Sequence, residues 1–362
     1  MASPANAYHP DYVSPPGETL DELLEERGMS QAELAERTGR PKKTINAIIQ
    51  GKTAITPETA LQFERVLGTP ASFWLKREQQ YREFLARQDD NQQLGQQVAW
   101  LNGVPWRELV KRGWIEPCDE LLDQLREVLR FFGIASPQQW EAVAVAFRQS
   151  QAFAANEMAV AAWLRQGERL AQAIDCAPFD AARFRQALQA ARALSHEAPE
   201  QGFERLPALC APAGVAVVIL PELPQTRLCG AARWLTPTKA LIQLSTRYKR
   251  DDQFWFSFFH EAGHILLHNK RDAYLDEEER EHTEKEDQAN RFAADTLIPP
   301  DILRAFLQRR RGGNISTAEV EQFATELGIA PGIVVGRLQR EKKIPPSHLN
   351  GLKRPLPTQV PQ

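Results

Sequence analysis

The chain has 362 residues, of which 43% are hydrophobic and 25% are charged, and its formal net charge is -3. This length predicts two or three domains with enough apolar residues for real cores, while a net charge close to zero indicates little about partners. No apolar run reaches the length of a membrane span and the polar start lacks the core of a signal peptide, so we expect a soluble cytoplasmic protein with no membrane partner. The cysteines are scattered without a CxxC pair, which indicates free thiols and neither disulfides nor zinc ligands; they are Cys118, Cys176, Cys210 and Cys229.

Residues 18 to 88 contain a succession of short segments with helical periodicity. The start signals are a cap or a proline at Ser30, Pro41 and Thr56, and the stop signals are Gly28, Gly39, Gly51 and Gly68. Such a succession, with a tight glycine-containing turn between the second and third helices, is typical of a helix-turn-helix domain. The prediction is an all-α DNA-binding domain over residues 1–90.

Basic side chains gather around the third predicted helix, and no acidic residue occurs from Arg37 through Lys52. The N-terminal end of this helix is expected to enter the major groove, and the start of the second helix to contact a backbone phosphate. The candidate DNA-binding residues are Gln31, Arg40, Lys42, Lys43, Thr44, Asn46 and Lys52. A small helical protein-binding domain with a solvated basic face is the alternative.

The first predicted helix is strongly acidic, with five carboxylates between Glu18 and Glu26. We expect this surface to face away from DNA, where it is either solvated or in contact with a basic protein partner. One such domain has too small a footprint for high specificity, so we expect a homodimer on a double-stranded operator with two-fold symmetry.

The segment from Pro16 to Arg87 resembles the Xre-type helix-turn-helix of the HigA antitoxin family. The matching residues are Ser30 to Ala35, Gly51, Lys52, Ile55 to Pro57, Ala60, Phe73 to Leu75 and Tyr81, with Glu78 where the family usually has glutamine. The resemblance implies operator binding, autorepression of a toxin-antitoxin operon and contact with a cognate toxin protein.

The middle of the chain carries no recognisable chemistry. Residues 88–97 are polar and glutamine-rich, and residues 104–195 show an alanine-rich helical periodicity. We predict a helical connector over residues 91–205 that packs against the domains or mediates dimerisation.

Strand signals follow at residues 215–220, 229–235 and 240–245, which are rich in β-branched and other apolar residues. Three short strands make a small sheet against which a following helix can pack, and an edge strand of such a sheet can bind an extended peptide. Together with the HExxH motif at residues 260–264, this order predicts an α+β, zincin-like domain over residues 206–353.

An HExxH motif, His260 to His264, lies inside an apolar run after the third strand. On a helix, the two histidines lie on one face about one turn apart, so that both imidazoles can reach a single Zn²⁺ ion. Glu261 then lies beside the open coordination position, where a general base for water is needed.

A catalytic zinc requires a third protein ligand, and Glu286 is the best placed candidate in the sequence. Asn290, one turn later, could orient a ligand histidine by accepting its second ring N–H. Both residues could instead be solvated positions on an amphipathic helix, and His282 and Asp287 remain alternative third ligands. His268 lies about 12 Å along the helix from the first histidine, too far to be a ligand.

The stretch from about Gly214 to Lys353 resembles the ImmA/IrrE family of metallopeptidase-like domains. The matching segments are Gly230 to Ala232, Phe254 to His268, Glu286 to Ala293 and Ile329 to Leu338, with a mild departure at Leu297 to Pro299. The resemblance implies zinc at His260, His264 and Glu286 with Glu261 as base, and substrates that are repressors with a helix-turn-helix.

Amide hydrolysis also needs a group that stabilises the oxyanion, and the nearby candidates are Arg247, Tyr248, Tyr274 and His282. Residues 323–338 again show helix, turn and helix, where core packing is favoured over a second DNA reader. The proline- and glutamine-rich end, residues 354–362, is expected to be disordered.

The chain is therefore predicted to be a multi-domain repressor and antitoxin of a toxin-antitoxin or phage-defence operon that carries a zinc metallopeptidase domain. The alternative is a stress-activated zinc endopeptidase that cleaves a helix-turn-helix repressor or itself. A peptidase whose helix-turn-helix only recruits protein substrates is less consistent with the basic third helix.

Overall fold

The computed structural model describes residues 12–141, 153–269, 274–277, 284–309 and 314–357, and the chain forms two compact units, Met1–Ala99 and Trp100–Gln362. Helix α5 continues through the predicted end of the first domain at residue 90, so the first unit is longer than expected. Within the described residues, no helix has the length and apolar character needed to cross a membrane.

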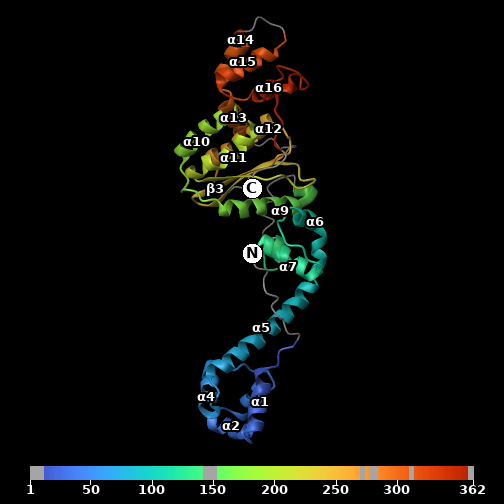
Figure 1. Cartoon of the computed structure of the whole chain (residues 1–362), viewed down its shortest axis with the longest axis vertical. Coiled ribbons are helices and arrows are strands. Elements are labelled where there is room, and N and C mark those ends of the chain that lie inside the picture. Colours follow the sequence, from blue (N-terminus) through green and yellow to red (C-terminus); the bar gives the residue numbers. More distant parts are fainter. Residues whose placement is uncertain (1–11, 142–152, 270–273, 278–283, 310–313, 358–362) are drawn as a thin grey trace. The chain divides into compact units, whose positions relative to one another are not determined.

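The first unit is a set of helices (Figure 1). They are α1 Pro16–Glu26, α2 Gln31–Thr38, α3 Lys42–Ile49, α4 Pro57–Leu67 and α5 Ala71–Gly95. The predicted start signals are confirmed at α2 and α4, where the hydroxyl groups of Ser30 and Thr56 accept hydrogen bonds from backbone N–H groups of the first turn. Gly39 and Gly68 end these helices in the left-handed conformation.

The core of the first unit is small and mostly apolar. Its largest fully buried side chains are Leu20, Leu34, Ile45, Ile48, Phe63, Leu67 and Trp74. Gly17 lets α1 approach α3 closely, because a Cβ atom there would lie 2.2 Å from the carbonyl oxygen of Ile48. This packing fixes α3 and leaves its polar face on the surface.

The second unit contains most of the helices and the single sheet of the described residues (Figure 1). Its α-helices are α6 Trp106–Lys111, α7 Leu121–Phe132, α9 Phe153–Ala173, α10 Ala181–Leu194, α11 Pro199–Cys210, α12 Asp251–Leu267, α13 Glu284–Leu297, α14 Pro300–Arg309, α15 Thr317–Leu327 and α16 Pro331–Arg340. Short 3-10 helices are η1 Val98–Gly103, η2 Pro137–Gln139, η3 Ala211–Ala213 and η4 Asn350–Leu352.

The sheet has four strands in the order β1-β3-β2-β4. They are β1 Val215–Ile219, β2 Leu228–Thr236, β3 Lys239–Leu244 and β4 Tyr274–Glu277. β1 pairs parallel with β3, whereas β2 pairs antiparallel with both β3 and β4. The first three strands were predicted; β4 was not, because its four residues are too few for a strand pattern.

The two faces of the sheet carry different helices. Val217, Ala232 and Ile242 belong to the same buried core as α12, which lies on one face together with α10, α11 and α13 (Figure 1). On the opposite face, the amide of Gln243 donates to the carbonyl of Trp163 in α9 at 2.7 Å. The sheet is therefore the middle layer, with α9 on one face and the HExxH helix α12 on the other.

The helices expected to form a connector that packs against the domains or mediates dimerisation belong to the second unit from Trp100 onward. Side chains from α10 and α11, including Phe184, Leu188 and Phe203, share the core with the sheet and α12. Earlier in the sequence, the guanidinium of Arg112 donates to the backbone carbonyls of Pro221 and Glu222 at 2.7 and 2.8 Å. Alanine-rich periodicity predicts helices but does not tell which surface they cover, so sequence alone did not assign them to this core.

The end of the described chain is packed, and the prediction of disorder from residue 354 is wrong for residues 354–357. Arg354 forms an ion pair with the fully buried Asp251 at 2.7 Å, and Leu356 is buried in the main core. Residues 358–362 lie outside the described part. Helix α16 contributes Val334, Val335 and Leu338 to the same core, consistent with packing as the role of residues 323–338.

Candidate metal centre and nucleic-acid surface

The HExxH helix α12 is buried on nearly all sides because apolar residues surround the motif. Phe258, Phe259 and Ala262 are fully buried, and the helix lies between the sheet, α13 and α16. A helix that is apolar around most of its circumference is expected in such a central position. His260 and Glu261 are themselves 0% exposed, so polar groups of the motif lie in an interior where each needs a partner.

Three side chains converge at one point of this interior. The Nε2 atoms of His260 and His264 lie 2.9 Å apart, and they lie 3.2 and 3.3 Å from the two carboxylate oxygens of Glu286. The ligand atoms of all three residues lie within 4.8 Å of one another. Two imidazoles and one carboxylate make a donor set that suits Zn²⁺ with a fourth position left open.

The close approach of α12 and α13 brings Glu286 to the histidines. Gly263 lies at their interface, where a Cβ atom would be 3.2 Å from Cα of Ala289 and from a ring carbon of Phe292. Among the described residues that can bind a metal, Glu286 joins the two histidines whereas Asp287 on the next position is exposed. His282, the other alternative ligand, lies outside the described residues.

The environment keeps Glu286 ionised. Burial alone would raise the pKa of its carboxyl group. Hydrogen bonds and positive charge from His260 and His264 lower that pKa by a larger amount, so that it lies well below the ordinary glutamate value. The group is therefore an anion at neutral pH, as a zinc ligand must be.

Glu261 lies between helix and sheet. A Cβ atom on Gly230 of β2 would lie 2.7 Å from Oε1 of Glu261, so the carboxylate is in direct contact with the strand. Gly230 pairs with Leu244 of β3 on one side and with Asp276 of β4 on the other. A side chain at this position would have to displace the Glu261 carboxylate.

A hydrogen-bonded chain behind His264 was missed by the sequence reasoning, which considered His268 only as a ligand. Nδ1 of His264 lies 2.9 Å from Nδ1 of His268, whose Nε2 lies 3.1 Å from Oε1 of Gln288. The amide nitrogen of Gln288 donates to Glu284 at 3.2 Å. The available signal was the spacing: a histidine one turn after a ligand histidine lies on the same helix face.

The remaining predicted roles stay predictions. Asn290 lies half-buried on α13, one turn after Glu286. Arg247 and Tyr248 are half-buried in the loop between β3 and α12. The side chains of the other two oxyanion candidates, at positions 274 and 282, lie outside the described residues.

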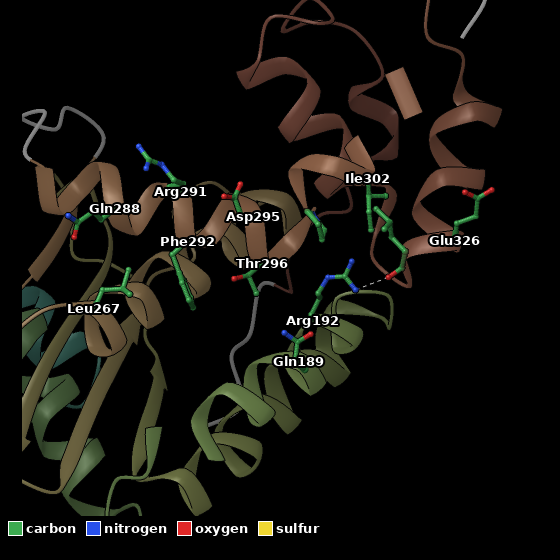
Figure 2. A pocket seen from close by; sticks show the side chains of 12 residues that line it. Gln189, Arg192, Leu267, Gln288, Arg291, Phe292, Asp295, Thr296, Ile302 and Glu326 are labelled. Atoms are coloured by element: carbon green, nitrogen blue, oxygen red, sulfur yellow. Dashed lines mark hydrogen bonds between the residues drawn. The ribbon is translucent and has the colours of Figure 1, made fainter. Parts of the chain in front are cut away.

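A groove with a volume of about 860 Å³ lies beside the centre, between α10, α13, α14 and α15 (Figure 2). Arg192 forms one wall and donates to the carbonyls of Leu297 and Leu327 at 3.0 and 2.8 Å. None of the described residues that line the groove belongs to the His260, His264 and Glu286 group, but Gln288 does line it. The groove therefore touches the far end of the hydrogen-bonded chain.

In the first unit, the predicted DNA-binding residues fall into two groups. Lys42, Lys43, Asn46 and Lys52 are exposed on or just after α3, and Thr44 is half-buried. Arg40 and Gln31 are instead engaged within the unit: Arg40 donates to Gln62, and Gln31 donates to Asp21 at 3.4 Å. One acidic side chain of α1 thus lies beside a predicted phosphate contact, whereas the acidic surface was expected to face away.

Glu78, which stands where the HigA family usually has glutamine, is buried in α5. Its carboxylate accepts hydrogen bonds from the backbone N–H of Ile55 at 3.0 Å and from Arg82 at 2.7 Å. It therefore holds the segment between α3 and α4, which is a structural role.

Comparisons with known proteins agree with this division of the chain. Residues 20–74 match a family described as Helix-turn-helix, and residues 221–339 match Peptidase_M78, the IrrE N-terminal-like domain. The chain is 33% identical over 60 residues to the uncharacterized HTH-type transcriptional regulator YddM of Escherichia coli (strain K12). That match covers 17% of this chain and 64% of the relative, less than two thirds of its length.

Two solved structures are similar over a short part of the chain. An antidote protein of a plasmid maintenance system from Nostoc punctiforme PCC 73102 is 28% identical, with 23% of this chain and 91% of that chain covered and a TM-score of 0.23. An addiction module antidote protein of the HigA family from Coxiella burnetii is 30% identical, with 23% and 92% covered and a TM-score of 0.22. From the two family matches, the chain joins a helix-turn-helix domain to an IrrE N-terminal-like domain of the Peptidase_M78 family.

Proposed function

We propose that this chain is a transcription repressor that binds double-stranded operator DNA through α3 and cleaves a protein substrate at a zinc centre formed by His260, His264 and Glu286. The observation that carries the enzymatic part is the convergence of the three ligand atoms within 4.8 Å beside Glu261. A decayed site would have no reason to keep the ligands, the base and the glycine that accommodates it.

Zinc held by these three side chains would supply a Lewis acid that activates a water and polarises the scissile carbonyl. Glu261 takes a proton from the attacking water on a carboxylate oxygen and gives it to the departing amine nitrogen. The burial of the motif keeps competing water away from this carboxylate and strengthens its interactions with charged groups.

The support for DNA binding and repression comes from the first unit. Exposed lysines on α3 and the lack of acidic residues around it suit contact with phosphates and base edges. The chain acts as a homodimer on its operator, because one helix-turn-helix has too small a footprint for high specificity. The resemblance of Pro16 to Arg87 to HigA antitoxins supports autorepression of a toxin-antitoxin or phage-defence operon, with the cognate toxin as a partner.

A second candidate is a stress-activated endopeptidase that cuts a helix-turn-helix repressor, including its own DNA-binding unit. It is favoured by the intact set of Glu261 and its three neighbours in a buried site. The two candidates share the metal centre and differ in their main output, which is repression of an operator in the first and cleavage of a repressor in the second.

The test is intact-mass analysis of the zinc-loaded chain, incubated alone and with the protein encoded beside it, next to two variants. Glu261→Gln removes the base without changing size, and Glu200→Gln changes an exposed carboxylate in the same way. Fragments that form in the wild-type chain and in Glu200→Gln but not in Glu261→Gln would establish the peptidase. Intact masses in all samples, with zinc bound, would leave a repressor whose metal domain is a scaffold or sensor.

A further inference from the structure

His268 and Gln288 have no role in the chemistry above, yet they form a continuous chain of contacts from His264 to the surface. His268 ends α12, and its backbone N–H donates to the carbonyl of His264 at 3.2 Å. Its ring is half-buried and bridges His264 and Gln288, which borders the groove of Figure 2. Because both ring nitrogens of His268 have hydrogen-bond partners, its ring is held in one orientation. A residue that positions another side chain must itself be held in this way.

The direction of each hydrogen bond follows from the partners. The amide nitrogen of Gln288 donates to Glu284, so its Oε1 faces His268 and can only accept. Nε2 of His268 therefore donates, and in a neutral ring its Nδ1 is left as an acceptor. The Nδ1 of His264 must then donate to it.

This assignment settles what His264 offers to the metal centre. With its proton on Nδ1, the ring of His264 carries its lone pair on Nε2, the atom that lies near His260 and Glu286. The second-nitrogen partner of a ligand histidine is usually a carboxylate, a backbone carbonyl or water. Here the partner of His264 is a second histidine, His268, which is hydrogen-bonded to the side-chain amide of Gln288.

We propose that His268 is a positioning residue of the metal centre, which holds His264 in its Nδ1–H form and orientation, and that Gln288 acts only through His268. The proposal deepens the proposed zinc site and rests on it.

The first measurement needs no metal: nitrogen NMR of the histidine rings in the metal-free full-length chain. At an alkaline pH, at which the imidazole rings are uncharged, we expect His264 to carry its proton on Nδ1 in the wild-type chain and to gain Nε2–H in His268→Ala. His268→Asn should restore the Nδ1–H form, because the amide oxygen of asparagine occupies nearly the position of the imidazole Nδ1. His348→Ala is the matched control, since His348 bonds a backbone carbonyl far along the chain from the motif.

The second measurement is zinc affinity by competition with a chelator. We expect His268→Ala to weaken binding about 10- to 100-fold, Gln288→Ala to weaken it less, and the double variant to be no worse than His268→Ala alone. Gln322→Ala removes a similar exposed amide–carboxylate contact, Gln322 to Glu326 at 3.1 Å, and should leave affinity unchanged.

Several results would overturn the proposal: an Nε2–H form of His264 in the wild-type chain, an unchanged ring in His268→Ala, or additive losses in the double variant. If His268→Ala does not fold, the proposal is tested with His268→Asn and Gln288→Ala. Unchanged zinc affinity in Gln288→Ala would contradict a role for Gln288 in holding His268. A wild-type chain that binds no zinc would refute the proposed function, while the ring NMR would still test His268.

Discussion

Gly230 in β2 and Glu261 in α12 touch across the interface of sheet and helix, where a Cβ atom at position 230 would lie 2.7 Å from the Glu261 carboxylate. Gly230→Ala must displace that carboxylate, because the strand is held by β3 and β4 on both sides. A displacement of about 1 Å in a general base can cost about 100-fold in rate, so Glu261-dependent cleavage should fall by that order while zinc affinity stays unchanged.

Gly351→Ala is the control for that experiment, since a Cβ atom there meets no atom within 4 Å. Equal cleavage by Gly230→Ala and the wild-type chain would show that the carboxylate does not act from this position.

Arg354 should stabilise the second unit. Its guanidinium pairs with Asp251, which is 0% exposed, and also donates to the carbonyls of Ser195 and Glu197. Arg354→Ala leaves a buried carboxylate without its cation and should cost about 3 kcal/mol in the free energy of unfolding by urea. Arg205→Ala removes an exposed ion pair with Glu197 and should cost less than about 1 kcal/mol. Similar losses in the two variants would contradict this role of the Arg354–Asp251 ion pair.

Cys210 should report unfolding of the second unit. Burial, with a smaller contribution from Cys176, raises the pKa of Cys210 to about 12, so its thiol stays protonated and covered in the folded chain. At pH 8 we expect iodoacetamide to modify the partly exposed Cys118 and Cys176 in the folded protein, and Cys210 only after urea is added. Peptide mass mapping checks this, and rapid labelling of Cys210 without urea would be inconsistent with its burial in the core.

The exposed lysines at the start of α3 should contribute to DNA binding through phosphates. Lys42→Ala and Lys43→Ala should each weaken binding to duplex DNA and reduce the slope of log affinity against log salt by about 1. Lys76→Ala, an exposed lysine on α5, should change neither quantity. Fluorescence anisotropy on the promoter of the chain's own gene measures both. An unchanged slope in the two α3 variants would exclude this end of α3 from the interface.

Local signals predicted much of this fold. Ser30 and Thr56 marked helix starts because a cap acts within one turn, and the HExxH spacing placed two imidazoles on one face because the helix period is local too. Glu286 was proposed as the third ligand from its place downstream of the motif and from the resemblance to the ImmA/IrrE family, and its carboxylate does lie beside the two histidines.

What escaped prediction depends on contacts between distant parts of the chain. The role of His268 depends on its contact with Gln288 of another helix. The close contact at Gly230 depends on the Glu261 carboxylate lying against the strand. The placement of α10 and α11 in the main core also follows from packing and not from periodicity. Engagement of Arg40 by Gln62 is likewise a tertiary contact that charge patterning does not reveal.

The central claim is that His260, His264 and Glu286 form one zinc centre, and the most direct test is the zinc content of the purified chain and of two neighbouring variants. Elemental analysis after dialysis should find about one zinc per chain in the wild type and in Asp287→Asn, and loss of most of it in Glu286→Gln, because Glu286 is the carboxylate that meets the two histidines among the described residues. Full zinc content in Glu286→Gln, or loss in Asp287→Asn alone, would contradict the account.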